Sequence, residues 1–219
     1  EYTFPSADTA LAEPGEDAEL VAGRYRIEDA LGKGGMSKIF RVTHVGMGRE
    51  LALKIINTEM ASDPKMRSHF EREARVLSQL EHPHVVQITD FGVDAKWGAF
   101  IVMEYVRGET LLERLQRERR LPPSLALDIA LQVADAVSYI HQRDLVHCDI
   151  KAENVLLSPG TVAQRRRVVV KLIDFGLSRT RTQNVKLRRS EIGGTPQYMA
   201  PEQIQGVAPS PASDLYALG

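Results

Sequence analysis

The chain contains 219 residues, of which 43% are hydrophobic and 26% are charged, and its formal net charge at pH 7 is −1. These values are typical of a globular domain, and near neutrality gives no electrostatic indication of nucleic acid as a partner. The single cysteine, Cys148, excludes a disulfide framework and favours the reducing cytoplasm as compartment. No apolar run reaches the roughly 18 residues that a membrane span requires.

The first half of the chain predicts an acidic leader followed by strands. Residues 1–23 are rich in Ala, Pro and acidic residues and carry no Lys or Arg, which is typical of a flexible segment. Apolar or alternating patterns predict the strands, which are residues 24–27, 39–42, 51–56, 85–88 and 100–103. Apolar residues within 64–80 recur at helical spacing and predict one amphipathic helix.

The second half predicts mainly helices. Thr110 and Glu113 have the spacing of a capping box, which opens a helix, and a longer helix is expected over residues 123–141. Two short strands follow at residues 155–157 and 168–173, joined by a polar connection. A strand-rich half followed by a helical half indicates an α+β fold of two lobes with a cleft.

A glycine-rich segment, Leu31–Ile39, lies between the first two predicted strands. Glycine lets the backbone approach a phosphate closely and present its N–H groups to it. Taken alone, however, a glycine-rich hairpin is more often a plain turn than a nucleotide site. Because no helix follows the segment, the dinucleotide-binding fingerprint does not fit.

Lys54 and Glu73 are charged residues at positions where burial is expected. Lys54 stands between apolar neighbours in a predicted strand, and Glu73 falls on the apolar face of the following helix. A buried charge is costly unless it is paired, so each residue is the natural partner of the other. A solvated lysine and a glutamate at the helix edge remain the alternative.

The segment His147–Asn154 carries the strongest chemical signal. It offers the Asp149 carboxylate, the Lys151 ammonium and the Asn154 carboxamide within one short turn between a helix and a strand. A carboxylate can deprotonate a hydroxyl, an ammonium can stabilise a phosphoryl group in transfer, and an amide oxygen can bind magnesium. Asp174, which follows the next apolar strand, suits a hard metal ion.

Taken in order, these motifs resemble those of a known enzyme family. They are the glycine-rich segment, Lys54, Glu73, the His147–Asn154 segment, Asp174-Phe175-Gly176 and Ala200-Pro201-Glu202. Their order and types resemble the eukaryotic-like protein kinases, in particular the bacterial serine/threonine branch, from about Arg24 to Gly219. The resemblance implies a bilobal fold, with an N-lobe of antiparallel sheet plus one helix at residues 24–107 and a mainly helical C-lobe at residues 108–219. It also implies that the C-lobe continues past Gly219, so we expect the chain to be a fragment.

The resemblance implies a catalytic role for four residues. Asp149 would accept the proton of the substrate hydroxyl, and Lys151 would steady the γ-phosphate of ATP. Glu73 would hold Lys54 against the α- and β-phosphates.

It also implies a binding site for ATP and its metal. Asn154 and Asp174 would bind Mg²⁺, or Mn²⁺ in its place. The residues expected around ATP are Leu31, Gly32, Lys33, Gly34, Gly35, Met36, Ser37, Ile39, Ala52, Lys54, Met103, Glu104, Val106 and Leu156.

Two positions depart from the family pattern. Ser37 stands where the third glycine of the loop is usual, and Cys148 stands where an arginine normally grips a phosphorylated activation segment. Activity is therefore expected to depend only weakly on phosphorylation of that segment. The residues expected to receive phosphate there or to contact the substrate are Thr182, Ser190 and Thr195.

The expected reaction is transfer of the ATP γ-phosphate to Ser or Thr hydroxyls of proteins in signal transduction. It is expected in the cytoplasm, without nucleic acid, and with a second copy of the chain as candidate partner for autophosphorylation. A membrane anchor beyond residue 219 stays open. Two alternatives also stay open: a pseudokinase that binds nucleotide as a scaffold, and a small-molecule kinase of the aminoglycoside or choline type.

Overall fold

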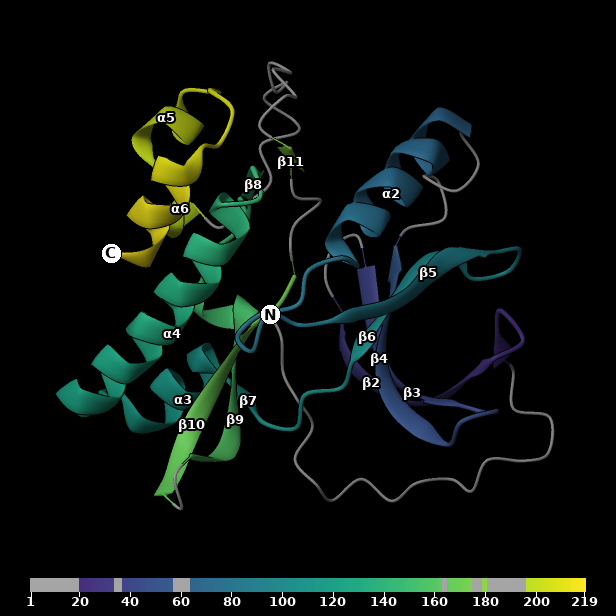
Figure 1. Cartoon of the computed structure of the whole chain (residues 1–219), viewed down its shortest axis with the longest axis horizontal. Helices are drawn as coiled ribbons and strands as arrows, with labels where there is room; N and C mark the ends of the chain where they lie inside the picture. The colour runs from purple at the N-terminus through teal and green to yellow at the C-terminus, as the bar shows by residue number, and fades with distance from the viewer. Residues whose placement is uncertain (1–19, 34–36, 57–63, 163–164, 175–178, 181–195) are drawn as a thin grey trace. The chain divides into compact units, whose positions relative to one another are not determined.

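A computed structural model of the chain describes residues 20–33, 37–56, 64–162, 165–174, 179–180 and 196–219 (Figure 1). The chain divides into two compact units. Unit 1 comprises Glu1–Leu80 and Gln87–Tyr105, and unit 2 comprises Glu81–Val86 and Val106–Gly219. Each unit has its own sheet and its own buried apolar residues.

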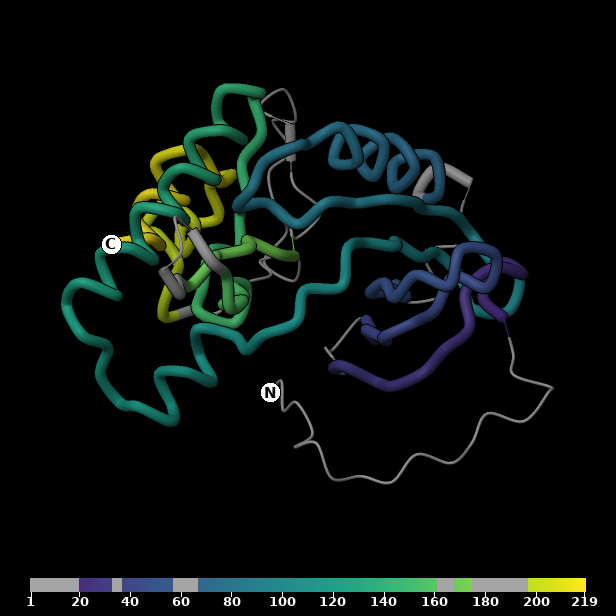
Figure 2. Tube along the Cα trace, turned by 60° about the horizontal axis from the view of Figure 1, so that its bottom comes forward, coloured from purple at the N-terminus to yellow at the C-terminus, as the bar shows by residue number. Residues whose placement is uncertain are grey.

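Unit 1 is built on an antiparallel sheet of six strands in the order β1-β2-β3-β4-β6-β5. The strands are β1 (Leu20–Val21), β2 (Tyr25–Lys33), β3 (Ser37–His44), β4 (Arg49–Ile56), β5 (Ile88–Asp94) and β6 (Gly98–Glu104). Figure 2 shows β2, β3 and β4 as successive antiparallel passes of the chain. The turn between β3 and β4 ends at Gly48, whose φ of 62° is a left-handed conformation that glycine adopts without strain.

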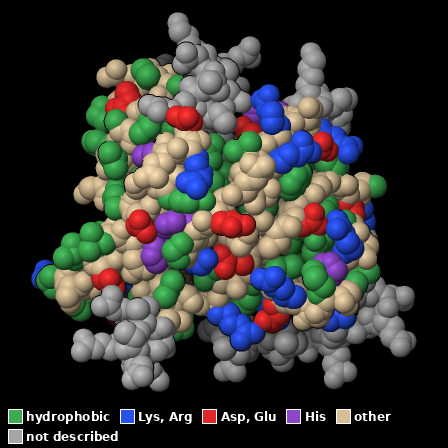
Figure 3. All heavy atoms as spheres, in the orientation of Figure 1, with side chains coloured by type: hydrophobic (Ala, Val, Ile, Leu, Met, Phe, Trp, Pro, Cys, Tyr) green, Lys and Arg blue, Asp and Glu red, His purple; other side chains and the backbone are tan. Residues whose placement is uncertain are grey.

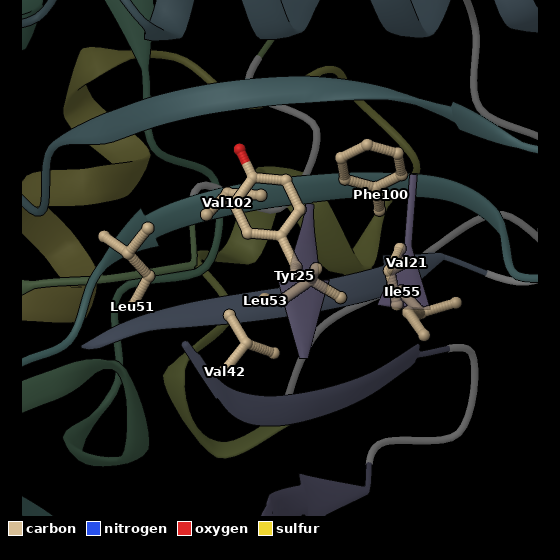
Figure 4. Packing of buried hydrophobic residues seen from close by; sticks show 8 residues of the cluster. All are labelled: Val21, Tyr25, Val42, Leu51, Leu53, Ile55, Phe100 and Val102. Carbon is tan, nitrogen blue, oxygen red and sulfur yellow. The ribbon is translucent and has the colours of Figure 1, made fainter. Parts of the chain in front are cut away.

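One face of this sheet carries the core of unit 1 (Figure 4). The cluster comprises Val21, Tyr25, Val42, Leu51, Leu53, Ile55, Phe100 and Val102. Successive residues of a strand face opposite sides, so Leu51, Leu53 and Ile55 enter the core from β4 together. Ala52 and Lys54 therefore belong to the other face of the sheet.

Three boundaries in or next to unit 1 differ from the sequence prediction. The helix α2 (Pro64–Leu77), which lies beside β5 in Figures 1 and 2, ends before residue 80. The strand predicted at residues 85–88 is wrong, because β5 starts at Ile88 and Val85 forms only an isolated bridge, with Leu172. Before Arg24, β1 pairs with β2 and buries Val21 completely.

Unit 2 contains most of the described helices. They are α3 (Leu111–Glu118), α4 (Pro123–His141), α5 (Pro201–Ile204) and α6 (Pro211–Leu218). The predicted capping box of α3 is confirmed, because Glu113 N donates to the Thr110 side chain over 3.1 Å and Thr110 N donates to the Glu113 carboxylate over 2.7 Å. Helix α4 buries one stripe at helical spacing, which is Ile129, Val133, Ala136, Val137 and Ile140. This stripe packs α4 from Ile129 to its last turn.

Short strands and turns connect these helices. A sheet of order β10-β9-β7 joins β7 (Glu109–Thr110), β9 (Val155–Val162) and β10 (Arg165–Leu172), and β8 (Leu145–Val146) pairs with β11 (Arg179–Thr180). Two 3-10 turns are η1 (Ala152–Asn154) and η3 (Pro196–Tyr198). The connection predicted over residues 158–167 is too long, because residues 158–162 pair with residues 165–169 and prolong the β9–β10 hairpin.

The strand-rich unit 1 and the helix-rich unit 2 confirm the α+β class. Among the described residues, no helix has both the length and the apolarity needed to cross a bilayer. On the face drawn in Figure 3, the coloured Lys and Arg side chains are interspersed with Asp and Glu side chains.

Candidate active site

The strand register of unit 1 brings several predicted nucleotide-binding residues into one row. Gly32 of β2 is opposite Ile39 of β3, Ile39 is opposite Lys54 of β4, and Lys54 is opposite Ile101 of β6. Residues directly opposite one another in an antiparallel sheet share a face. The row therefore lies on the face of the sheet opposite to the core cluster.

Lys54 and Glu73 both belong to unit 1, on β4 and α2 respectively. Lys54 is half-buried, between neighbours Leu53 and Ile55 that are 0% and 8% exposed. Glu73 is 6% exposed, and its Oε1 lies 3.4 Å from Nε2 of His69, one helical turn earlier. The predicted burial of Glu73 is confirmed, whereas its ion pair with Lys54 stays a prediction.

The predicted adenine-binding segment begins at the end of β6. Ala52 is opposite Met103, so the two residues share a face of the sheet. Gln87 binds Glu104 twice, because Gln87 N donates to Glu104 Oε1 and Glu104 N donates to Gln87 O, each over 2.9 Å. Any contact of adenine with the Glu104 backbone therefore falls to the carbonyl oxygen.

In unit 2, the predicted catalytic residues converge on one carboxylate. Lys151 Nζ lies 2.9 Å from Asp149 Oδ2, and Asn154 Nδ2 donates to the same oxygen over 2.9 Å. Asn154 Nδ2 also donates to the Asp149 carbonyl over 2.8 Å. Both contacts to the carboxylate are made to Oδ2, and neither involves Oδ1.

The β9–β10 hairpin brings the two predicted metal ligands to the same end of the sheet. Asn154 precedes β9, and its carbonyl accepts the Ile173 N–H over 2.9 Å, directly before Asp174. Asp174 has a φ of 59°, which is rare outside glycine and is common at functional sites.

The orientation of the Asn154 amide fits a hard cation. Both hydrogens of Nδ2 are used by Asp149, so the amide oxygen is directed away from this contact. Carboxylate and amide oxygens are the ligand types that Mg²⁺ takes in proteins. Among the described residues, no group of three or more His, Cys, Asp or Glu side chains is arranged so that it could hold a metal ion by itself.

His147 is completely buried and links the loop to the strand end. Its Nδ1 lies 3.3 Å from the donating Asp149 N–H, and its Nε2 lies 3.1 Å from the Ile173 carbonyl. Because Nδ1 accepts, the proton belongs on Nε2, which is the neutral tautomer. Burial lowers the pKa of His147 below its usual 6.5, against the raising effect of the Asp214 charge.

Asp214, near the start of α6, binds the same loop although it lies 66 positions after Cys148 in the sequence. Its side chain is 1% exposed, and it accepts the His147 N–H at Oδ2 over 2.8 Å and the Cys148 N–H at Oδ1 over 2.9 Å. Cys148 has a φ of 70°, a strained conformation for a residue with a side chain. Asp214 thus binds two consecutive backbone N–H groups of the loop, one with each carboxylate oxygen.

For several other predicted residues, the structure gives the strand or segment in which they lie. Leu156 on β9 is half-buried opposite Lys171, and Val106 begins the second segment of unit 2. Leu31 and Lys33 are in β2, and Ser37 begins β3. The remaining predicted site residues, which lie outside the described residues, are Gly34, Gly35, Met36, Thr182, Ser190 and Thr195.

Two further polar residues near the loop, His141 and Ser213, are not marked by any motif in the sequence. His141 Nε2 lies 2.8 Å from Asp214 Oδ2, and Ser213 donates to Glu202 over 2.7 Å. That hydrogen bond lowers the pKa of Glu202 below its usual 4.5. The only sequence signal for His141 is a histidine at the end of a helix whose neighbour, Ile140, is apolar.

Comparisons with a family model and with known proteins agree on one family. Residues 25–219 match the model of the protein kinase domain. The chain is 38% identical to serine/threonine-protein kinases PknA of Corynebacterium glutamicum, over 92% of this chain and 42% of that protein. It is 37% identical to serine/threonine-protein kinase pkn2 of Myxococcus xanthus, over 93% of this chain and 24% of that protein. It is 36% identical to PknA of Mycobacterium tuberculosis, over 91% and 46%.

The chain spans less than half the length of these relatives. The family match, by contrast, covers the described strands and helices from β2 to α6 and includes every part of the candidate site. The chain therefore belongs to the protein kinase domain family.

Proposed function

We propose that this chain catalyses transfer of the ATP γ-phosphate to Ser or Thr hydroxyls of proteins. The observation that carries the proposal is the convergence of Lys151 and Asn154 on Oδ2 of Asp149. A carboxylate that is bound through Oδ2 keeps its second oxygen, Oδ1, for an incoming hydroxyl, as a general base requires. The names of the relatives, all serine/threonine-protein kinases, support the same reaction.

Each residue of the cluster has a distinct role in this proposal. Asp149 Oδ1 orients the substrate hydroxyl and accepts its proton as the new O–P bond forms and the bond from the γ-phosphorus to the bridging oxygen breaks, with ADP as the leaving group. Lys151, already beside Asp149, donates to the γ-phosphoryl oxygens as charge shifts toward the leaving group. Asn154 keeps Asp149 in place through Nδ2 and has its amide oxygen directed toward a metal ion.

The residues of unit 1 are proposed to hold the nucleotide. Lys54 binds the α- and β-phosphates, and the buried Glu73 supports its ammonium group. The row from Gly32 through Ile39 to Lys54 supplies backbone and apolar contacts for the phosphates and adenine. Met103, Glu104 and Val106 are proposed to follow the adenine edge, with Ala52 and Leu156 on its faces.

Asn154 and Asp174 are proposed to hold Mg²⁺, which supplies charge neutralisation between the β- and γ-phosphates when bound. Lys151 and Thr195 favour Ser or Thr as acceptor, and Thr182 and Ser190 are candidate phosphorylation sites. A cytoplasmic location and self-association for autophosphorylation complete the proposal.

The test is transfer of label from γ-labelled ATP to a generic protein substrate with Mg²⁺. Asp149→Asn keeps the size of the side chain but cannot accept the proton, so kcat should fall by about 10²- to 10⁴-fold. Asp135→Asn is the matched control, because Asp135 is 63% exposed and contacts His82, away from the loop. Equal rates for wild type and Asp149→Asn would refute the proposed role.

The same assay separates the alternatives. A pseudokinase would show Mg-ATP-dependent thermal stabilisation without transfer of label to protein. A small-molecule kinase would label an aminoglycoside or choline and leave protein unlabelled.

A further inference from the structure

Unit 2 contains a pocket outside the proposed active site. Helix α3, helix α4 and the β9–β10 hairpin lie side by side there (Figure 1), and they enclose a cavity of about 960 Å³. Cavities of this size bind ligands in many proteins. None of the described residues that line it belongs to the His147–Asn154 segment.

The pocket offers apolar contacts and backbone donors together. Leu125, Leu157, Pro159 and Val168 line it with apolar groups. Ser124 and Leu125 also belong to the first turn of α4, where N–H groups have no partner inside the helix, and the N-cap residue supplies no side-chain cap. A peptide suits this combination, because its carbonyl groups accept hydrogen bonds while its side chains fill apolar space.

The charged residues around the pocket favour a cation. Arg114 forms ion pairs with Glu109 at 3.2 Å and with Glu118 at 2.7 Å, and Arg117 also pairs with Glu109. With Asp128, which lines the pocket, these two cations and three acids sum to a formal charge of −1. A carboxylate has several acceptor positions, so Asp128 can bind a guanidinium or ammonium group in addition to its contacts within the chain.

An exposed apolar face of α4 continues from the pocket. Ser124, Asp128 and Leu131 follow one another at spacings of four and three residues, so they share one face of the helix. Leu131 and Leu127, one turn earlier, are each 61% exposed. Ser124 and Leu131 are about 11 Å apart along the helix axis, which is the length of about three residues of an extended chain. A small molecule in the pocket would leave both leucines in water, whereas an extended peptide can cover them.

We propose that the pocket, together with Leu127 and Leu131, is a docking site for an extended segment of a protein substrate that carries a Lys or Arg close to apolar residues. Asp128 binds the cation, and the apolar side chains of the segment contact the pocket and the two leucines. The inference rests on the proposed function, because a kinase that acts on proteins gains effective concentration of the acceptor hydroxyl from a second contact with its substrate.

The first measurement is binding in the absence of ATP. A set of fluorescein-labelled nonapeptides carries two Leu residues and one Arg, with the Arg at each spacing from one to four residues from the first Leu. The peptides lack Ser, Thr and Tyr, so they offer no acceptor hydroxyl. At least one should bind saturably by fluorescence anisotropy, and replacement of its Arg by Glu should weaken binding about tenfold or more. Absence of binding by every peptide, or equal binding of the Glu version, would overturn the proposal.

Two variants locate the bound peptide. Asp128→Asn keeps the shape of the side chain and removes its charge, and Leu131→Gln replaces an exposed apolar residue by a good helix former. Each should raise the Kd of the peptide about fivefold or more. Met47→Gln is the matched control, because Met47 is 66% exposed but lies in the turn between β3 and β4 of unit 1, and it should leave Kd unchanged.

Two results of these experiments would contradict the docking site. One is wild-type affinity for the peptide in both Asp128→Asn and Leu131→Gln. The other is a dimer in sedimentation velocity that Leu131→Gln dissociates, because a second copy of the chain would then cover this face.

The effect on phosphate transfer is measured separately. The peptide that binds best is joined to an acceptor peptide with one Ser, and KM should fall about tenfold relative to the acceptor alone. Leu131→Gln should cancel that gain, and an unchanged KM in the wild type would overturn the docking role. Absence of any transfer by the wild type would instead contradict the proposed function, and the binding measurements would then decide the docking site by themselves.

Discussion

Gly108 packs its backbone against β9 so closely that even a methyl group has no room. A Cβ built at this position would lie 2.2 Å from the Leu157 carbonyl oxygen, 2.9 Å from Leu157 C and 3.1 Å from Ser158 Cα. All three neighbours are backbone atoms, which cannot move by changing a rotamer. We therefore expect Gly108→Ala to separate the chain before β7 from β9.

The magnitude follows from the contacts that this separation would break. Strand β7 pairs with β9 at Glu109↔Leu157 and Thr110↔Leu156, and the Ser158 hydroxyl donates to the Arg107 carbonyl over 2.9 Å. Two or three hydrogen bonds of about 1 kcal/mol each, together with the steric cost of overpacking, give a loss of about 2–4 kcal/mol. Because Leu156 is displaced as well, KM for ATP should rise in the same variant.

The measurement is urea unfolding followed by far-UV circular dichroism, with KM for Mg-ATP in parallel. Gly46→Ala is the matched control, since its Cβ would meet only the His44 ring, at 3.4 Å, and Gly46 does not have a positive φ. That variant should change the free energy of unfolding by less than about 0.5 kcal/mol. A Gly108→Ala protein with wild-type stability would refute the reasoning, because the steric overlap of the new Cβ with the Leu157 carbonyl oxygen would then have no energetic cost.

Two further predictions concern pH and phosphorylation. Burial lowers the pKa of His147 below 6.5, so the unfolded chain binds a proton there that the folded chain does not. The contribution of His147 to the free energy of unfolding is therefore complete above pH 6.5 and falls as the pH drops below that value, by at most about 1.4 kcal/mol per pH unit. Urea unfolding between pH 8 and 5.5 should show a smaller decline in the free energy of unfolding for His147→Gln than for the wild type. In the activation segment, replacement of all four acceptors by Ala should cost little kcat, because Cys148 provides no cation for a phosphate; a loss of 100-fold or about that size would contradict this. These acceptors are Ser178, Thr180, Thr182 and Ser190.

Features encoded by neighbouring residues could be predicted from the sequence. The capping box at Thr110 and Glu113 and the alternation that places Lys54 opposite the core face both depend on spacings of a few residues. The geometry of the Asp149 loop also follows from a short segment, since Lys151 and Asn154 lie within five positions of it.

Features set by contacts between distant segments could not be predicted in this way. His141 and Asp214 are 73 positions apart, and no periodicity relates a helix end to the start of another helix. The start of β5 is similar: the apolar residues before Ile88 suit a strand locally, but Val86 N and Leu172 N are satisfied by residues of unit 2 instead. Tertiary pairing of this kind overrides local propensity because a strand needs a partner for its hydrogen bonds.

The effect of having Cys148 where the family usually has an arginine depends on these distant contacts. The contacts that fix the loop come from Asp214, His147 and Asn154 within unit 2, and none of them uses the side chain at position 148. Each of these groups is buried, and each donates to or accepts from the loop backbone or the Asp149 carboxylate. The proposed base is thus oriented by contacts within unit 2, and we expect a phosphate on the activation segment to contribute little to its orientation.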